Sequence, residues 1–111
     1  MRIIKEITFD EQLGDYIVND QRLFSDCVEF QLKQIRRRAM DEILNVAPDY
    51  KQRNAALGLL SEIENQQLKD NIQQIRNISN SLEQQILSIT WDGTEETRSS
   101  ACDAVQNIRW P

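Results

Sequence analysis

Apolar side chains recur every three or four residues along most of this chain, the spacing that places them on one side of an α-helix. The first stripe of this kind consists of Phe24, Val28, Leu32, Ile35, Ala39, Ile43 and Val46. It stops at Ala47-Pro48, where proline ends one helix and also fits the first position of the next. The short link at residues 45–49 predicts an antiparallel helical hairpin, with one kinked continuous helix as the alternative.

The next stripe has a heptad period, which predicts coiled-coil-like packing of a long central helix over about residues 49–90. Leu60 and Ile63 fall out of the heptad register, and we expect both to face the first helix. The predicted interaction seam comprises Leu60, Ile63, Leu68, Ile72, Ile75, Leu82, Ile86 and Ile89. An apolar heptad looks the same whether it closes within one chain, between copies or against another protein, so the sequence leaves the stoichiometry open.

A polar residue, Ser79, occupies one core position of this heptad. A buried polar residue weakens a seam but helps to fix its register. In the alternative, Ile78 turns inward and Ser79 lies at the periphery, and both arrangements fit the pattern.

The two ends of the chain have weaker patterns. Residues 1–9 form a β-rich run too short to make a sheet alone, which we interpret as an extended arm, either docking or frayed. Asp10 is a candidate N-cap for a first helix over about residues 10–46, although Gly14 weakens its start and the helix could begin at Asp20 instead.

At the other end, Gly93 predicts the C-terminus of the long helix, and Thr94 is a candidate cap for a third helix over about residues 95–108. Trp91 and Trp110 flank this helix. A tryptophan in such a place is either a packing plug or, if exposed, a docking residue.

These elements predict an all-α fold, a helical hairpin with a long central helix and a short C-terminal helix. The arm at residues 1–9 precedes a single helical domain at residues 10–111. With 111 residues, three Gly and two Pro, the chain has the length of one domain and few turn formers.

The charge pattern of the chain limits the classes of partner that it can bind. The net charge of −5 repels phosphate backbones and anionic membranes. The basic cluster at residues 33–38 is typical of a solvated helix face, and nucleic-acid binding through it is the weaker reading. Residues 1–7 are broken by charge, so we expect neither a signal peptide nor a membrane span. We expect protein partners, either copies of this chain or other subunits, and an oligomeric state.

Candidate catalytic chemistry is sparse. The chain has no histidine, no glycine-rich phosphate loop and no metal-ligand spacing. Cys27 and Cys102 are far apart in sequence and are expected to be half-buried thiols in a reducing compartment. The sequence predicts a protein that is not an enzyme and has no cofactor, no metal site and no catalytic residue.

The segment Ala47-Pro48-Asp49-Tyr50-Lys51-Gln52-Arg53-Asn54 resembles one found in small virion and tail-associated helical proteins of tailed bacteriophages and prophages. Ile75-Arg76, Ser79 and Leu82-Glu83 are similar to a later helix of those proteins, and Ile108-Arg109-Trp110-Pro111 is similar to their ending. The chain departs from the family at Ala55-Ala56, where an Ala-Arg pair is usual, and residues 1–46 have no counterpart there.

The resemblance implies a structural role in the virion, near the tail, with localisation to the particle and to the host cytoplasm during assembly. Within the first of these segments, Pro48, Tyr50, Lys51 and Arg53 are the predicted corner of the helical hairpin, and the last three fit the first turn of the second helix equally well. The alternative is an assembly factor or regulatory adaptor that binds a protein transiently and is absent from the mature particle.

Overall fold

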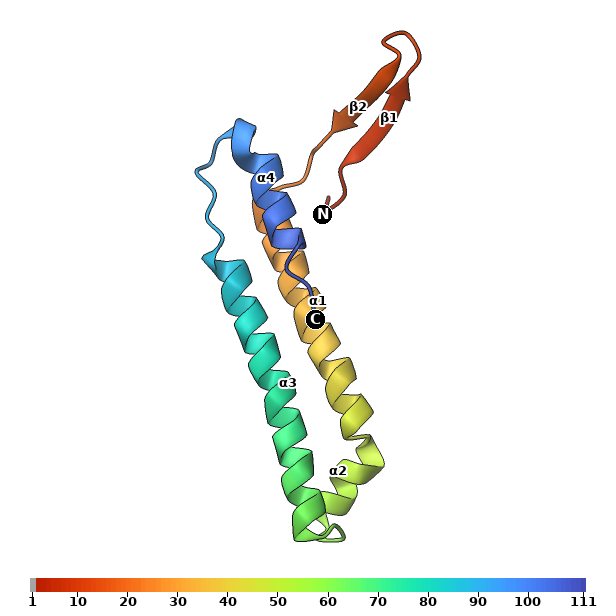
Figure 1. Ribbon diagram of the computed structural model, residues 1–111, viewed down its shortest axis with the longest axis vertical. Coiled ribbons are helices and arrows are strands. Elements are labelled where there is room, and N and C mark those ends of the chain that lie inside the picture. Colours follow the sequence, from red (N-terminus) through yellow and green to blue (C-terminus); the bar gives the residue numbers. More distant parts are fainter. Residues whose placement is uncertain (1) are drawn as a thin grey trace.

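Two long antiparallel helices form the body of the molecule (Figure 1). In the computed structural model, which describes residues 2–111, α1 spans Phe24–Val46 and α3 spans Glu62–Ser88. The short helix α2, Asp49–Ala56, connects them, and α4, Glu95–Gln106, packs against α1. The result is a rod with extents of 69 × 30 × 21 Å. The predicted helical hairpin with a long helix and a short C-terminal helix is confirmed.

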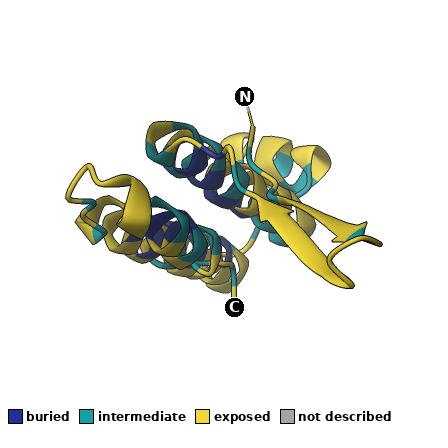
Figure 2. Cartoon of the chain, turned by 90° about the horizontal axis from the view of Figure 1, so that it is seen from above, coloured by how far each residue is buried: buried dark blue, intermediate teal, exposed yellow. Residues whose placement is uncertain are grey.

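The core lies between α1, α3 and α4 at the end of the rod where the three helices meet (Figure 2). Its buried members come from all three helices and are Cys27, Ile35, Leu82, Ile86, Cys102 and Val105. Phe24, Ile89 and Trp110 pack against this cluster from its edges. Toward α2 the rod has only the α1/α3 pair, where Ala39, Leu68 and Ile75 are buried.

Ser79 lies in the α1/α3 contact and is 8% exposed, while Ile78 is half-buried and packs against the core cluster. Both side chains therefore point toward the interior of the bundle, and Ser79 is the more buried of the two. The interpretation that places Ser79 at a core position is the one that the structure supports.

The start of the first helix was predicted wrongly. Residues 10–23 are not helical: β1, Glu6–Asp10, and β2, Asp15–Asn19, form an antiparallel β-hairpin, and α1 begins only at Phe24. Gly14 has φ +65° and its N–H donates to the carbonyl oxygen of Asp10, which closes the turn. The Asp10 carboxylate accepts the N–H groups of Gln12 and Leu13, so it caps a turn where the pattern predicted a helix cap.

The second helix was also predicted too long. Instead of one helix over residues 49–90, α2 ends at Ala56 and α3 begins at Glu62, with Gly58 at φ +72° between them. Ser61 caps α3 in a reciprocal arrangement with Glu64, which fixes the new start. The helix then ends at Ser88, close to the predicted end at about residue 90, and α4 ends at Gln106 rather than at residue 108.

The break between α2 and α3 changes which way the neighbouring side chains point. Ile63 is 72% exposed and does not face α1, and Leu60 is half-buried in the connection. The expectation that both pack on the first helix is wrong for Ile63, because α3 starts from a cap at Ser61 and not as a continuation of α2.

Ile86→Ala tests the three-helix core. Ile86 is fully buried, so its truncation is expected to lower the free energy of unfolding by about 3 kcal/mol. The neighbouring Leu87 is 64% exposed, and Leu87→Ala is expected to change it by about 0.5 kcal/mol or less. Urea unfolding followed by circular dichroism measures both, and equal losses in the two variants would contradict this packing.

Candidate protein-interaction surface

The β-hairpin has one apolar and one polar face. The register pairs Ile7 with Val18 and Phe9 with Tyr16, and residues two apart on a strand share a face. We call these four residues the apolar hairpin face. The opposite face carries Glu6 with Asn19, Thr8 with Ile17 and Asp10 with Asp15. One face of the hairpin therefore consists of four large apolar side chains.

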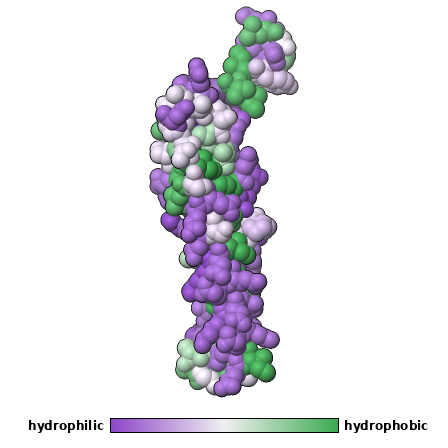
Figure 3. Space-filling model, turned by 60° about the vertical axis from the view of Figure 1, so that its left-hand side comes forward, coloured by the Kyte–Doolittle hydropathy of each residue, from purple (hydrophilic) through white to green (hydrophobic). Residues whose placement is uncertain are grey.

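Nothing in residues 2–111 covers this apolar hairpin face. Ile7, Phe9, Tyr16 and Val18 are 58%, 56%, 67% and 57% exposed. The hairpin projects beyond the end of the rod, and the space-filling view shows apolar side chains on it (Figure 3). The rings of Phe9 and Tyr16 meet edge to face with centroids 5.2 Å apart, the only cross-strand aromatic contact described.

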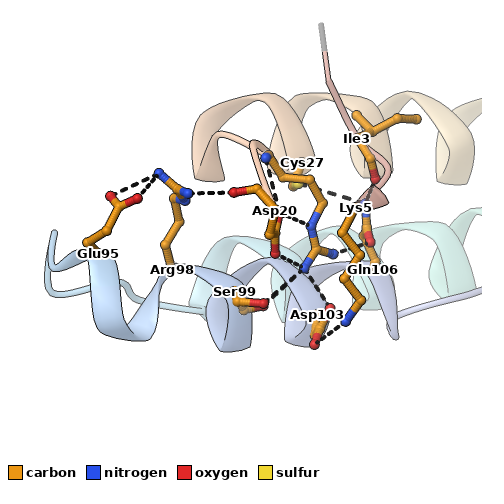
Figure 4. A network of polar contacts seen from close by, with 10 residues as sticks. Ile3, Lys5, Asp20, Cys27, Glu95, Arg98, Ser99, Asp103 and Gln106 are labelled. Carbon is orange, nitrogen blue, oxygen red and sulfur yellow. Dashed lines mark hydrogen bonds and ion pairs between the residues drawn. The ribbon is translucent and has the colours of Figure 1, made fainter. Parts of the chain in front are cut away.

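Arg22 fixes the hairpin on the bundle. Its guanidinium is 1% exposed and forks onto the Asp20 carboxylate, with Nε donating at 2.9 Å and Nη2 at 2.7 Å. The same group reaches α4, where Nη2 donates to Asp103 at 2.8 Å and Nη1 donates to Gln106 at 2.7 Å (Figure 4). One buried cation therefore joins the segment between β2 and α1 to the C-terminal helix.

The other leg of the hairpin is held by the same side chains of α4. Gln106 donates its amide N–H to the carbonyl oxygen of Ile3, and Lys5 lies 3.4 Å from the Asp103 carboxylate. Arg98 donates to the carbonyl oxygen of Asp20 at 2.7 Å. Both legs are thereby tied to one helix, α4 (Figure 4).

The ionised state of this network is favoured electrostatically. Hydrogen bonds from Arg22 hold the pKa of Asp20 far below its ordinary value, against the opposing effect of burial. They also lower the pKa of Asp103, where the charges of Arg22 and Lys5 act in the same direction. The Arg22 guanidinium has a raised pKa, chiefly through its bond to Asp20.

A second apolar surface lies where the rod is only two helices thick. An open groove of about 430 Å³ runs between α1 and α3, and we call it the α1/α3 groove. Its lining residues are Arg36, Ala39, Met40, Ile43, Leu44, Ser79, Asn80 and Glu83. Met40 and Leu44 are 64% and 43% exposed. The α1 residues near Trp110 and Arg109, such as Phe30 and Gln34, are a different set, so the groove lies on another side of α1.

Most of the predicted interaction seam is closed within the chain. Leu68, Ile75, Leu82 and Ile86 are buried, and Ile72 and Ile89 are half-buried, because α1 covers α3. Of the three arrangements that the sequence left open, closure within one chain is the one observed. These residues hold α3 against α1.

The predicted hairpin corner and the two tryptophans lie in different parts of the structure. Pro48 precedes α2, and Tyr50, Lys51 and Arg53 lie on it, with Tyr50 64% exposed. Trp110 is half-buried against the core cluster, and Trp91 lies 5.7 Å from Phe24, centroid to centroid. The Trp91 indole donates to the carbonyl oxygen of Thr94. Packing accounts for both tryptophans, and the structure brings neither to the hairpin.

Two thiols that are distant in sequence meet in the core. Cys27 and Cys102 are both fully buried and unoxidised, and burial together with contact with Cys102 raises the pKa of Cys27 to about 12. They are more deeply buried than the sequence predicted. Within residues 2–111, no group of three or more His, Cys, Asp or Glu side chains is placed to hold a metal ion, and no helix has the length and apolarity to cross a membrane.

The sequence pattern missed the residues that matter most here. Ile7 and Phe9 were recognised only as part of a β-rich arm, and Tyr16, Val18 and Arg22 were placed in a helix. The available signal was the alternation of apolar residues in 6–10, followed by a four-residue turn that ends in Gly14 and by the strand-favouring run Tyr16-Ile17-Val18.

No protein-family model, no curated protein and no solved structure matches the chain. The resemblance to phage proteins therefore stays a prediction.

Acid unfolding tests the Arg22 network. The pKa values of Asp20 and Asp103 are depressed in the folded chain, so the unfolded chain binds these protons more readily. The stabilisation is complete above about pH 4 and is lost as the pH falls through the folded pKa values. Asp20→Asn is expected to lower stability at pH 7 and to flatten its decrease between about pH 4 and pH 2. Urea unfolding at several pH values measures this.

The matched control is Glu11→Gln, which removes one carboxylate from the exposed hairpin turn, where no basic partner is found among residues 2–111. It should leave the decrease in stability at acid pH as in the wild type. If Asp20→Asn also leaves that decrease unchanged, the proposed role of the Asp20–Arg22 pair is contradicted.

Proposed function

We propose that the chain is a structural protein that docks onto a protein partner through the apolar hairpin face and takes no part in catalysis. By its resemblance to small phage proteins, the assembly it joins is the virion of a tailed bacteriophage, close to the tail. The particle, and the host cytoplasm during assembly, are its proposed locations. The exposed face formed by Ile7, Phe9, Tyr16 and Val18 is the observation that carries the docking proposal.

The physical argument is that this face lacks the cover a sheet needs. A two-stranded hairpin is marginally stable in water unless its apolar side is buried. Burial stabilises by about 25 cal/mol per Å² of apolar surface, so four large side chains left in water represent a substantial gain for any partner that covers them. Residues 2–111 do not cover them, although α4 holds both legs of the hairpin.

The anchoring favours docking over a mobile arm. A surface that is already ordered loses less conformational entropy on binding than one that folds onto its partner. Arg22, Gln106 and Arg98 fix the base of the hairpin, so the apolar face is presented before the partner arrives.

The alternative function is an assembly factor or adaptor that uses the same face transiently. Mass spectrometry of purified phage particles, produced in the host cell that carries the gene, decides between the two functions. The structural proposal expects the chain in a fixed ratio to the other subunits. Its absence from the finished particle, together with binding to a subunit before assembly, would favour the adaptor.

Val18→Thr tests the docking face, with Ile17→Thr as its matched control. Threonine keeps the β-branched shape that favours strands, and the two neighbouring positions differ in the face that they occupy. We expect Val18→Thr to reduce incorporation into particles severalfold and Ile17→Thr to leave it near the wild-type level, as measured by quantitative mass spectrometry.

Circular dichroism and thermal unfolding of both variants check that the bundle is intact. Equal incorporation of the two variants would show that the apolar hairpin face is not the docking surface.

A further inference from the structure

We infer that Cys27 and Cys102 are a redox-sensitive pair, which a small-molecule disulfide oxidises to an intramolecular disulfide that ties α4 covalently to α1. Cys27 lies on α1 and Cys102 lies on α4, and both are 0% exposed. Both are free thiols, and both belong to the same core cluster. The inference concerns the core of the bundle and does not rest on the proposed function.

The position of α4 brings the two sulfur atoms together. Residues four apart on a helix lie one turn apart on the same face. Cys102 and Gln106 are such a pair, and the Gln106 side-chain amide donates to the Cys27 Sγ at 3.8 Å (Figure 4). The Cys102 side chain is itself a hydrogen-bond partner of the Cys27 thiol. The face of α4 that carries Cys102 is therefore the face that meets Cys27.

The two thiols are protected while α4 is packed against α1. The thiolate is the form that attacks a disulfide, and burial together with Cys102 raises the pKa of Cys27 to about 12. Neither cysteine is open to solvent. Oxidation therefore requires a local opening that moves α4 away from α1. Further along the rod, Ala39, Leu68 and Ile75 are buried between α1 and α3 and hold that pair together without α4.

The reaction consists of two thiol–disulfide exchanges, with oxidised glutathione as the oxidant. In the opened chain, one cysteine loses its proton and its sulfur attacks a glutathione sulfur, which forms a mixed disulfide and releases one glutathione thiolate. As α4 returns, the second cysteine loses its proton and attacks the cysteine sulfur of the mixed disulfide. The Cys27–Cys102 bond forms, the second glutathione thiolate leaves, and the two thiolates take up the two protons. The cysteines lose two electrons, and the glutathione disulfide gains them.

The disulfide secures the helix that holds the base of the β-hairpin. Through Gln106 and Arg98, α4 donates hydrogen bonds to both legs of the hairpin. In the reduced chain, an opening of α4 breaks these contacts together. In the oxidised chain, α4 stays linked to α1 near its start, and the cross-link also restricts the unfolded chain over residues 27–102. Oxidation is therefore expected to stabilise the folded protein.

Oxidation of the native wild-type chain tests the pair. The protein is incubated with oxidised glutathione without denaturant, and the product is identified by peptide mapping with mass spectrometry. We expect a disulfide between Cys27 and Cys102 of one chain, which dithiothreitol reverses. The loss of free thiol is expected to be roughly a hundredfold slower than in the urea-unfolded chain, because both thiols are buried in the folded one.

Urea unfolding of the oxidised and reduced forms measures the effect of the bond. The unfolding midpoint is expected to rise by about 1 M on oxidation, because the linked cysteines enclose most of the chain. Cys102→Ala is the matched control, since it keeps Cys27 but has no second thiol. After the same treatment, its midpoint should show no increase.

Three results would overturn the inference. The first is a wild-type product without the intramolecular disulfide, whether unreacted, in mixed disulfides or linked between chains. The second is an equal rate of thiol loss in the native and unfolded chains, which would show that α4 does not protect the pair. The third is an oxidised form no more stable than the reduced form, because a disulfide between badly placed sulfurs strains the fold.

Discussion

The buried guanidinium of Arg22 determines how the parts of this protein are arranged. It is 1% exposed, and its hydrogen bonds join Asp20, next to the hairpin, to Asp103 and Gln106 on the C-terminal helix. Removing one partner from such a network leaves an uncompensated buried charge, which is far more costly than losing a surface ion pair. Arg22 therefore ties the segment between β2 and α1 to α4, together with the hydrogen bonds from Gln106 to Ile3 and from Arg98 to Asp20.

The network explains how a thin rod can carry a projecting sheet. The α1/α3 pair has a modest core, and the three-helix end around Ile86 and Val105 is where the burial concentrates. The helix α4 is part of that end and also binds both legs of the hairpin. The packing of α4 in the core therefore holds the apolar hairpin face in a fixed orientation. The exposed hydrophobic side chains and the extended shape are the features of a protein that acts by binding partners.

The helices could be predicted from sequence because their signal is local. The apolar stripe from Phe24 to Val46 coincides with α1, and the heptad positions Leu68, Ile75 and Leu82 are buried as expected. The hairpin and the Arg22 network depend on contacts distant in sequence: Arg22 and Asp103 are 81 residues apart. Two further errors have local causes. Apolar residues continue through the break at Gly58, which hid the end of α2, and the Asp10 carboxylate caps a β-turn with the same chemistry that caps a helix.

Hydrogen–deuterium exchange of the wild type and of Arg22→Met tests the central claim most directly. If Arg22 holds the hairpin on α4, the substitution should remove protection from the amides of β1, β2 and α4 together while those in the middle of α1 and α3 keep theirs. Unchanged protection of the hairpin in Arg22→Met, or a hairpin that is already unprotected in the wild type, would contradict it.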